Sequence, residues 1–145
     1  MSSSVAETEG RVLGLDLGDA RIGVAISDSE RKLAVPLGTV PTGAPQDLKA
    51  IRKLVEENDV TAVVVGHPIS MSGAHGPRAR QAEEFAGALR SFVGIPVELH
   101  DERLSTVEAD RALREAGASG RERKRAVDRS AAAIILQGWL DRVGG

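Results

Sequence analysis

The chain has 145 residues, of which 41% are hydrophobic and 28% charged, and its formal net charge is −2. This length suits one domain with its own core, and no apolar run reaches the ~20 residues that a membrane-spanning helix needs. The absence of cysteine excludes disulfides and thiolate metal sites, and two Phe with one Trp are too few to stack single-stranded bases. Because the N-terminus lacks the pattern of a signal peptide, we expect a cytoplasmic protein without membrane attachment.

The beginning of the chain predicts a tail followed by a run of strands. Residues 1–9 are rich in Ser and Glu without periodicity, which predicts a disordered tail ahead of a single domain over residues 10–145. Three segments with alternating apolar side chains follow, at residues 11–18, 21–27 and 33–40. Since their connections are short, we predict a three-stranded antiparallel meander.

Asp16 stands where an ordinary core strand has a hydrophobic residue. Leu13 and Leu15 point to one side of the strand, whereas Asp16 shares the other side with Gly14 and Gly18. The glycines remove side-chain bulk from that face, so a large group can approach the carboxylate. The alternative is an Asp that specifies the fold as a hydrogen-bond acceptor.

The rest of the chain alternates helices and strands. The patterns predict a helix at 45–58, a buried strand at 61–66, an irregular loop at 67–76, a helix at 77–93, a strand at 95–103, and helices at 107–116 and 121–142. This order predicts an α/β fold with a mixed five-stranded sheet, three strands antiparallel and two parallel, flanked by helices. It is the order of a ribonuclease-H-like domain.

Two further carboxylates occupy unusual positions. Asp128 falls within the apolar arc of the final helix, where an ionised carboxylate is costly unless it is compensated. Glu102 stands at the carboxyl end of a strand, where α/β sheets place their sites. Each has an ordinary alternative: Asp128 in an exposed first helical turn beside Lys124 or Arg125, and Glu102 as a surface acid paired with Arg103.

Together, Asp16, Glu102 and Asp128 predict a metal site with catalytic function. Mg²⁺ and Mn²⁺ take oxygen ligands of this kind. Two such ions ~3.5–4 Å apart can activate a water molecule and stabilise the leaving oxygen in phosphodiester hydrolysis. We therefore predict a Mg²⁺- or Mn²⁺-dependent nuclease.

The three histidines predict no metal site of their own. His67, His75 and His100 lack the sequence spacing of a zinc site, so we expect ordinary loop or strand-end residues. No Ser/His/Asp set is apparent either. The sequence thus indicates the carboxylates, and not the histidines, as the candidate metal ligands.

Basic residues gather next to Asp128. Between residues 111 and 129 there are seven Arg or Lys and three acids, a local charge of +4. Arg78 and Arg80 follow the irregular loop and add to the candidate phosphate-binding groups. The alternative interpretation of the basic stretch is a solvated helix surface.

Four ordered blocks carry a family resemblance. They read LGLDLGDARIGVAISD, VVVGHPISMSGAHGPRARQAEEFAGAL, ELHDERLSTVEA and KRAVDRSAAAIILQGWLD. On these blocks the chain resembles the YqgF/RuvX family of RuvC-like nucleases from Arg11 to Asp141. The resemblance implies an RNase-H-like fold and a nuclease that processes the 5′ end of the 16S ribosomal RNA precursor. Its implied partners are precursor ribosomal RNA and the ribosome.

The resemblance also assigns residues. It implies that Asp16, Glu102 and Asp128 form the acidic metal site. The residues in the matching motifs that it implies as substrate-binding or supporting groups are Arg21, Arg103, Ser105, Thr106 and Lys124. The chain departs from the family where members commonly read GLP, because it has Gly66, His67 and Pro68 there. Compared with RuvC-type resolvases, an acid is missing after the strand at 61–66, and Glu102 stands in for it.

Other functions stay open at this point. One is a non-catalytic module that binds structured nucleic acid or a ribosome-assembly partner through the basic stretch, and another is a Holliday junction resolvase. A third is an actin-like ATPase, since a GLDLG hairpin also binds phosphates in that superfamily, although the chain is short for two lobes. Preference for RNA or DNA, the number of metal ions and the oligomeric state are not determined by the sequence.

Overall fold

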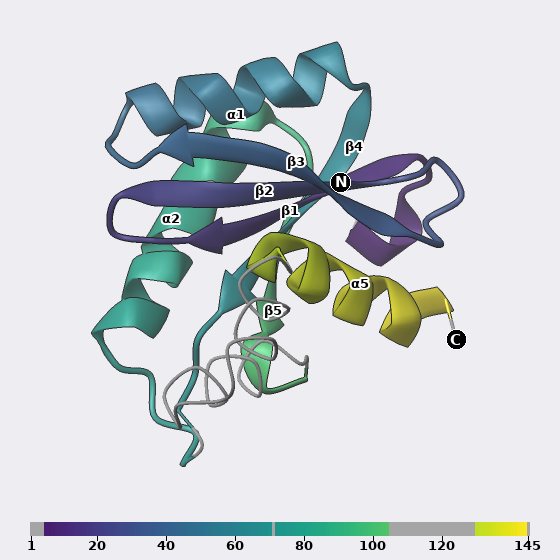
Figure 1. The fold of residues 1–145 in the computed structure, drawn as a ribbon. Coiled ribbons are helices and arrows are strands. Elements are labelled where there is room, and N and C mark those ends of the chain that lie inside the picture. The colour runs from purple at the N-terminus through teal and green to yellow at the C-terminus, as the bar shows by residue number, and fades with distance from the viewer. Residues whose placement is uncertain (1–4, 71, 105–129, 145) are drawn as a thin grey trace, which may run out of the picture.

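The computed structural model describes residues 5–70, 72–104 and 130–144. Its elements are η1 (Val5–Glu7), β1 (Arg11–Leu17), β2 (Arg21–Ser27), β3 (Ala34–Pro41), α1 (Gln46–Glu57), β4 (Val60–His67), α2 (Pro77–Val93), β5 (Val97–Asp101), η2 (Glu102–Leu104) and α5 (Ala131–Gly144). The five strands form one sheet in the order β3-β2-β1-β4-β5. β1, β2 and β3 are antiparallel neighbours, and β4 and β5 continue the sheet in parallel with β1 (Figure 1). The predicted mixed sheet is confirmed.

Alternation along the central strands produces two apolar layers, one on each face of the sheet. On β1, Leu13 and Leu15 belong to the layer that includes residues of α1 and α2, whereas Val12 belongs to the layer under α5. β4 divides in the same way, with Val63 and Val65 toward α1 and α2. Because successive strand residues face opposite sides, a position in β1 or β4 indicates which helices its side chain meets.

α2 has the ends that its sequence predicts. Pro77 stands in its first turn, where a missing N–H costs nothing. Gly94 ends the helix in the left-handed conformation, at φ 71°, and its N–H donates to the Arg90 carbonyl. The sequence thus determines where α2 begins and ends, and between these ends the helix packs against β4 and β5.

α5 packs directly on the strand backbones. A Cβ atom added at Gly14 would lie 2.7 Å from Leu136 Cβ, and one at Gly66 would lie 2.7 Å from Ile135 Cδ1. The residues of α5 buried in this contact are Ala132, Ile135, Leu136, Trp139 and Leu140. The apolar arc predicted for the final helix is confirmed over the described part, and residues 121–129 of that prediction lie outside it.

The N-terminal segment corrects one prediction. Val5 is 1% exposed and packs in the layer under α5, so the prediction of disorder is wrong for residues 5–9. Arg31 holds this segment, because its Nη1 donates to the Val5 carbonyl at 2.9 Å and its Nη2 to Thr8 Oγ1 at 2.6 Å. The composition of residues 1–9 does not predict that one Val is buried and that an Arg from a distant turn forms a hydrogen bond to its carbonyl.

Other element bounds differ slightly from the prediction. The last strand is shorter than residues 95–103, since β5 ends at Asp101 and Glu102 begins the η2 turn. The helix predicted at 107–116 lies outside the described residues. Within the described ranges, no helix combines the length and apolar character required to cross a lipid bilayer.

Candidate active site

Asp16 lies near the end of β1 on the face that α5 covers. Its neighbour across the β1–β2 pair is Gly23. A Cβ at Gly23 would lie 3.7 Å from both Asp16 Cβ and Ala132 Cβ. The glycine thus leaves space between the carboxylate-bearing residue and the start of α5. The predicted face of Asp16 is confirmed.

Glu102 lies on the same face of the sheet, at the end of β5, with β4 between it and β1. It follows β5 directly and is 6% exposed. A Cβ at Gly66 would lie 3.5 Å from Glu102 Cγ, so the glycine at this point of β4 makes room for the side chain. A carboxylate buried to this extent requires compensating positive charge or hydrogen-bond donors.

One pocket joins the two carboxylates. Its lining residues are Asp16, Leu17, Gly66, Pro68, Arg78, Gln81, Ala82 and Glu102. They come from β1, from the end of β4, from α2 and from η2. The structure therefore brings together three of the residues that the sequence selected, Asp16, Glu102 and Arg78. Gln81 was missed by the sequence analysis, because an exposed Gln on a helix carries no distinguishing pattern.

The donors in this pocket fit a hard divalent cation. Asp16 and Glu102 offer carboxylate oxygens from two separate elements, and oxygen is the ligand that Mg²⁺ and Mn²⁺ prefer. Mg²⁺ is commonly held by one or two carboxylates while it keeps water and substrate phosphates as its other ligands. Two carboxylates that line one pocket match that requirement.

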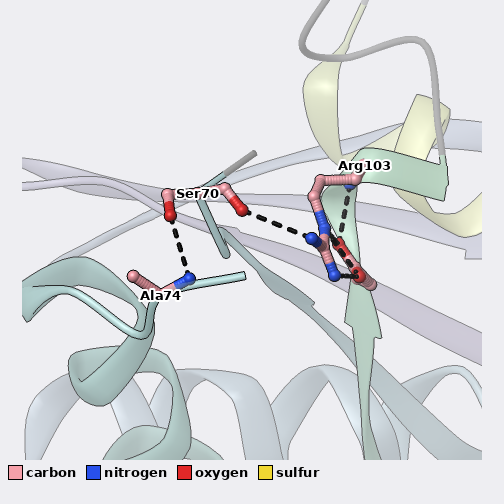
Figure 2. A network of polar contacts seen from close by, with 4 residues as sticks. Ser70, Ala74 and Arg103 are labelled. Atoms are coloured by element: carbon pink, nitrogen blue, oxygen red, sulfur yellow. Dashed lines mark hydrogen bonds and ion pairs between the residues drawn. The ribbon is translucent and has the colours of Figure 1, made fainter. Parts of the chain in front are cut away.

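Arg103 is paired with the acid next to Glu102. Its Nη2 donates to Asp101 Oδ2 at 2.7 Å, and its backbone N–H donates to Asp101 Oδ1 at 2.9 Å (Figure 2). Since these bonds favour the ionised form, Arg103 holds the pKa of the Asp101 carboxyl below its ordinary value. The charge of Asp101 is thus neutralised within the chain, which leaves Glu102 as the acid of this strand end in the pocket.

Arg103 also ties the end of β5 to the segment after β4. Its Nη1 donates to the Ser70 carbonyl at 3.3 Å, and Ser70 Oγ accepts the Ala74 N–H at 3.0 Å (Figure 2). The Gly73 N–H donates to the Ser70 carbonyl as well. Arg103 therefore fixes the described loop residues beside the pocket, in addition to any contact with substrate.

Of the remaining predicted site residues, Arg21 and Arg103 lie in the described part of the chain. Arg21 is exposed at the start of β2 and does not line the pocket. The predicted residues that lie outside the described part of the chain are Ser105, Thr106, Lys124 and Asp128, together with the basic stretch at 111–129. The third predicted metal ligand thus has no described position.

Two of the histidines form a second cluster with a glutamate. His67 and His75 both contact Glu83, with nitrogen-to-Oε2 distances of 2.7 and 2.8 Å. His100 is elsewhere, buried on β5, where burial lowers the pKa of its imidazole. His67 ends β4 and His75 lies in the loop before α2, as expected of strand-end and loop residues. Their shared contact with Glu83 is what sequence spacing does not reveal.

Comparisons with known proteins identify the family of the chain. The family model RuvX, described as Holliday junction resolvase, matches residues 10–142. A protein of Anaeromyxobacter dehalogenans named "Putative pre-16S rRNA nuclease" is 49% identical over 133 residues, which cover 91% of this chain and 97% of that protein. Proteins of the same name from Chloroflexus aggregans and Desulfitobacterium hafniense are 47% and 43% identical, over 92% of this chain and 94% and 93% of their own lengths.

The fold has a counterpart among solved structures. Thermus thermophilus RuvC in complex with a Holliday junction substrate matches with a TM-score of 0.55 at 16% sequence identity. The match covers 94% of this chain and 96% of that one. At this identity the match establishes the RNase-H-like fold that RuvC shares, and the sequence relatives carry the evidence for the family.

Proposed function

Because this chain belongs to the RuvX family, we propose that it is a divalent-metal-dependent nuclease that hydrolyses phosphodiester bonds and processes the 5′ end of precursor 16S rRNA. One observation carries the catalytic part of the proposal: Asp16 and Glu102, from elements far apart in sequence, line the same pocket. The shared name of the relatives from three bacterial genera supports the RNA substrate.

Asp16 and Glu102 are the proposed metal ligands and catalytic residues, with Asp128 as the third. Mg²⁺ or Mn²⁺ bound there would neutralise charge on the scissile phosphate and lower the pKa of a coordinated water. Without a cation, the two carboxylates repel the phosphate that has to approach them. The same residues therefore account for substrate placement and for metal dependence.

Arg78 is the proposed phosphate-binding residue of the described site. It is exposed in the first turn of α2 and lines the pocket together with Gln81, which lies three residues further along the helix. Positions three apart share a helix face, so both side chains project toward the pocket. A guanidinium binds phosphate oxygens in pairs, which orients the backbone relative to the carboxylates.

A cleavage assay with a matched pair of variants tests the proposal. The substrate is an end-labelled 16S rRNA precursor that carries its 5′ extension, incubated with Mg²⁺, Mn²⁺ or EDTA. Asp16→Asn is expected to lower the cleavage rate at least ~100-fold, since loss of a group that only orients a metal ligand already costs about 10–100-fold. Asp19→Asn, the same change at an exposed position of the β1–β2 turn, is expected to retain the wild-type rate.

Equal cleavage by wild type and Asp16→Asn would reject the proposal and reveal a contaminating nuclease. RNA binding by a wild type that cleaves nothing with either ion would favour the non-catalytic module instead. RNA binding by Asp16→Asn should persist, because the basic groups are untouched.

A four-way DNA junction is the second candidate substrate. It is favoured by the description of the family model as Holliday junction resolvase. Symmetric cleavage of a synthetic junction at a rate above that of the precursor RNA would assign the pocket to junction resolution. We expect the RNA to be the faster substrate.

A further inference from the structure

A cluster of two imidazoles and one carboxylate lies where the end of β4 meets α2, and it shares no residue with the acidic pocket. His67 is the last residue of β4, His75 precedes α2, and Glu83 lies in the second turn of α2. We propose that His67, His75 and Glu83 bind a borderline divalent cation of the Zn²⁺ class, in a site separate from Asp16 and Glu102. We name these three residues the histidine cluster.

The distances place all three ligands around one point. His67 Nε2 lies 2.7 Å from Glu83 Oε2, and His75 Nδ1 lies 2.8 Å from the same oxygen. The three potential ligand atoms lie within 4.8 Å of one another. The two imidazole rings meet edge to face, with centroids 5.1 Å apart and an interplanar angle of 81°. Each ring therefore directs a nitrogen at the carboxylate without stacking on the other ring.

The ligand types select the kind of ion. Imidazole nitrogens suit Zn²⁺ and related transition metals, whereas Mg²⁺ prefers oxygen throughout. Two His and one Glu form a known three-residue set for zinc, which leaves a fourth coordination position for water. The histidine cluster and the acidic pocket thus differ in chemistry as well as in position.

Ion binding requires a rearrangement of the side chains. Zn²⁺ bonds of about 2.0–2.2 Å place ligand atoms roughly 3.3–3.5 Å apart around a tetrahedral ion, so both imidazole contacts to Glu83 Oε2, at 2.7 and 2.8 Å, have to lengthen. The side chains of His75 and Glu83 are 50% and 38% exposed and have room to move, whereas His67 is 10% exposed and provides a fixed ligand.

Hydrogen bonding alone is the competing explanation. With protons on His67 Nε2 and His75 Nδ1, both rings donate to Glu83, and these bonds hold the pKa of the Glu83 carboxyl below its ordinary value. This pattern forms the same contacts without an ion. The two explanations differ in one measurable respect, which is affinity for the metal.

Titration of the full-length, tag-free protein with Zn²⁺ alone, after treatment with EDTA, separates them. Calorimetry is expected to show one equivalent of Zn²⁺ bound, and Co²⁺ in its place is expected to produce visible absorption typical of tetrahedral coordination. His75→Gln and Glu83→Gln are each expected to weaken Zn²⁺ binding at least ~10-fold, the lower bound for loss of a group that merely orients a ligand. Both positions are exposed enough that folding should persist.

Two controls make the assignment specific. Glu84→Gln removes the same charge from the neighbouring exposed position of α2 and is expected to bind Zn²⁺ like wild type. Asp16→Asn should also bind Zn²⁺ like wild type, because the acidic pocket is not involved. No Zn²⁺ binding by wild type, a change below tenfold in His75→Gln and Glu83→Gln, or loss of binding in Asp16→Asn would each overturn the proposal. None of these results depends on nuclease activity.

Discussion

The two faces of the sheet differ most at the end of β4, where consecutive residues belong to different sites. Gly66 lines the pocket that contains Asp16 and Glu102, and a Cβ atom added to it would point toward Ile135 of α5. His67, the next residue, turns to the other face and contacts Glu83 of α2. Because strand side chains alternate, one short piece of backbone supplies a carboxylate pocket on one side and an imidazole cluster on the other.

The difference teaches how one edge of a sheet accommodates two ligand chemistries without mixing them. The carboxylates of Asp16 and Glu102 suit Mg²⁺ or Mn²⁺, whereas the two imidazoles beside Glu83 suit Zn²⁺. α5 also rests directly on the backbone of Gly14 and Gly66, because neither residue has a side chain to separate strand and helix.

The largest effect is expected from Glu102→Gln, which tests whether the two faces are functionally independent. The substitution keeps the shape of the side chain and removes its charge, so metal-dependent cleavage of precursor 16S rRNA should fall at least ~100-fold. Zn²⁺ affinity, measured by calorimetry on the same sample, should stay within twofold of wild type. A parallel loss of both properties would show that the faces form one coupled site.

Gly14→Ala tests the close packing of the α5 face. Its new Cβ would lie 2.7 Å from Leu136 Cβ and 3.2 Å from the Ala132 carbonyl oxygen. Since one neighbour is backbone, α5 has to shift, and we expect a loss of about 1–3 kcal/mol in the free energy of unfolding, measured in urea. Unfolding within ~0.5 kcal/mol of wild type would mean that α5 is not held on β1 as described.

Gly87→Ala is the matched change on α2, and it should have the smallest effect and the opposite sign. An added methyl group meets no atom within 4 Å, and Ala is the better residue inside a helix. We expect a gain of about 0.5–1 kcal/mol in the free energy of unfolding, from the same urea titration. A loss instead would indicate that this side of α2 is covered by a partner or by a part of the chain not described here.

Much of the site could be predicted from local pattern. The alternation in β1 placed Asp16 on the face opposite Leu13 and Leu15, and the structure confirms it. The position of Glu102 at a strand end was also predicted correctly to within one residue. Its alternative as a surface acid is wrong, because Glu102 is 6% exposed.

What local pattern missed depends on contacts between distant segments. Val5 is ordered because its side chain packs in the layer under α5 and its carbonyl accepts a hydrogen bond from Arg31. No property of residues 1–9 alone predicts these partners. His67 and His75 meet at Glu83 because the loop between them returns to α2. The number of residues between the two histidines does not predict this shared contact.

The sequence by itself determined the strands, the helices and the face on which each side chain of a strand lies, because these follow from repeats of two and 3.6 residues in neighbouring positions. Only the tertiary structure decided which carboxylates share a pocket and which histidines share a carboxylate. These contacts are determined by the order of the strands in the sheet and by the path of the loops. Both are stabilised by interactions between residues remote in sequence.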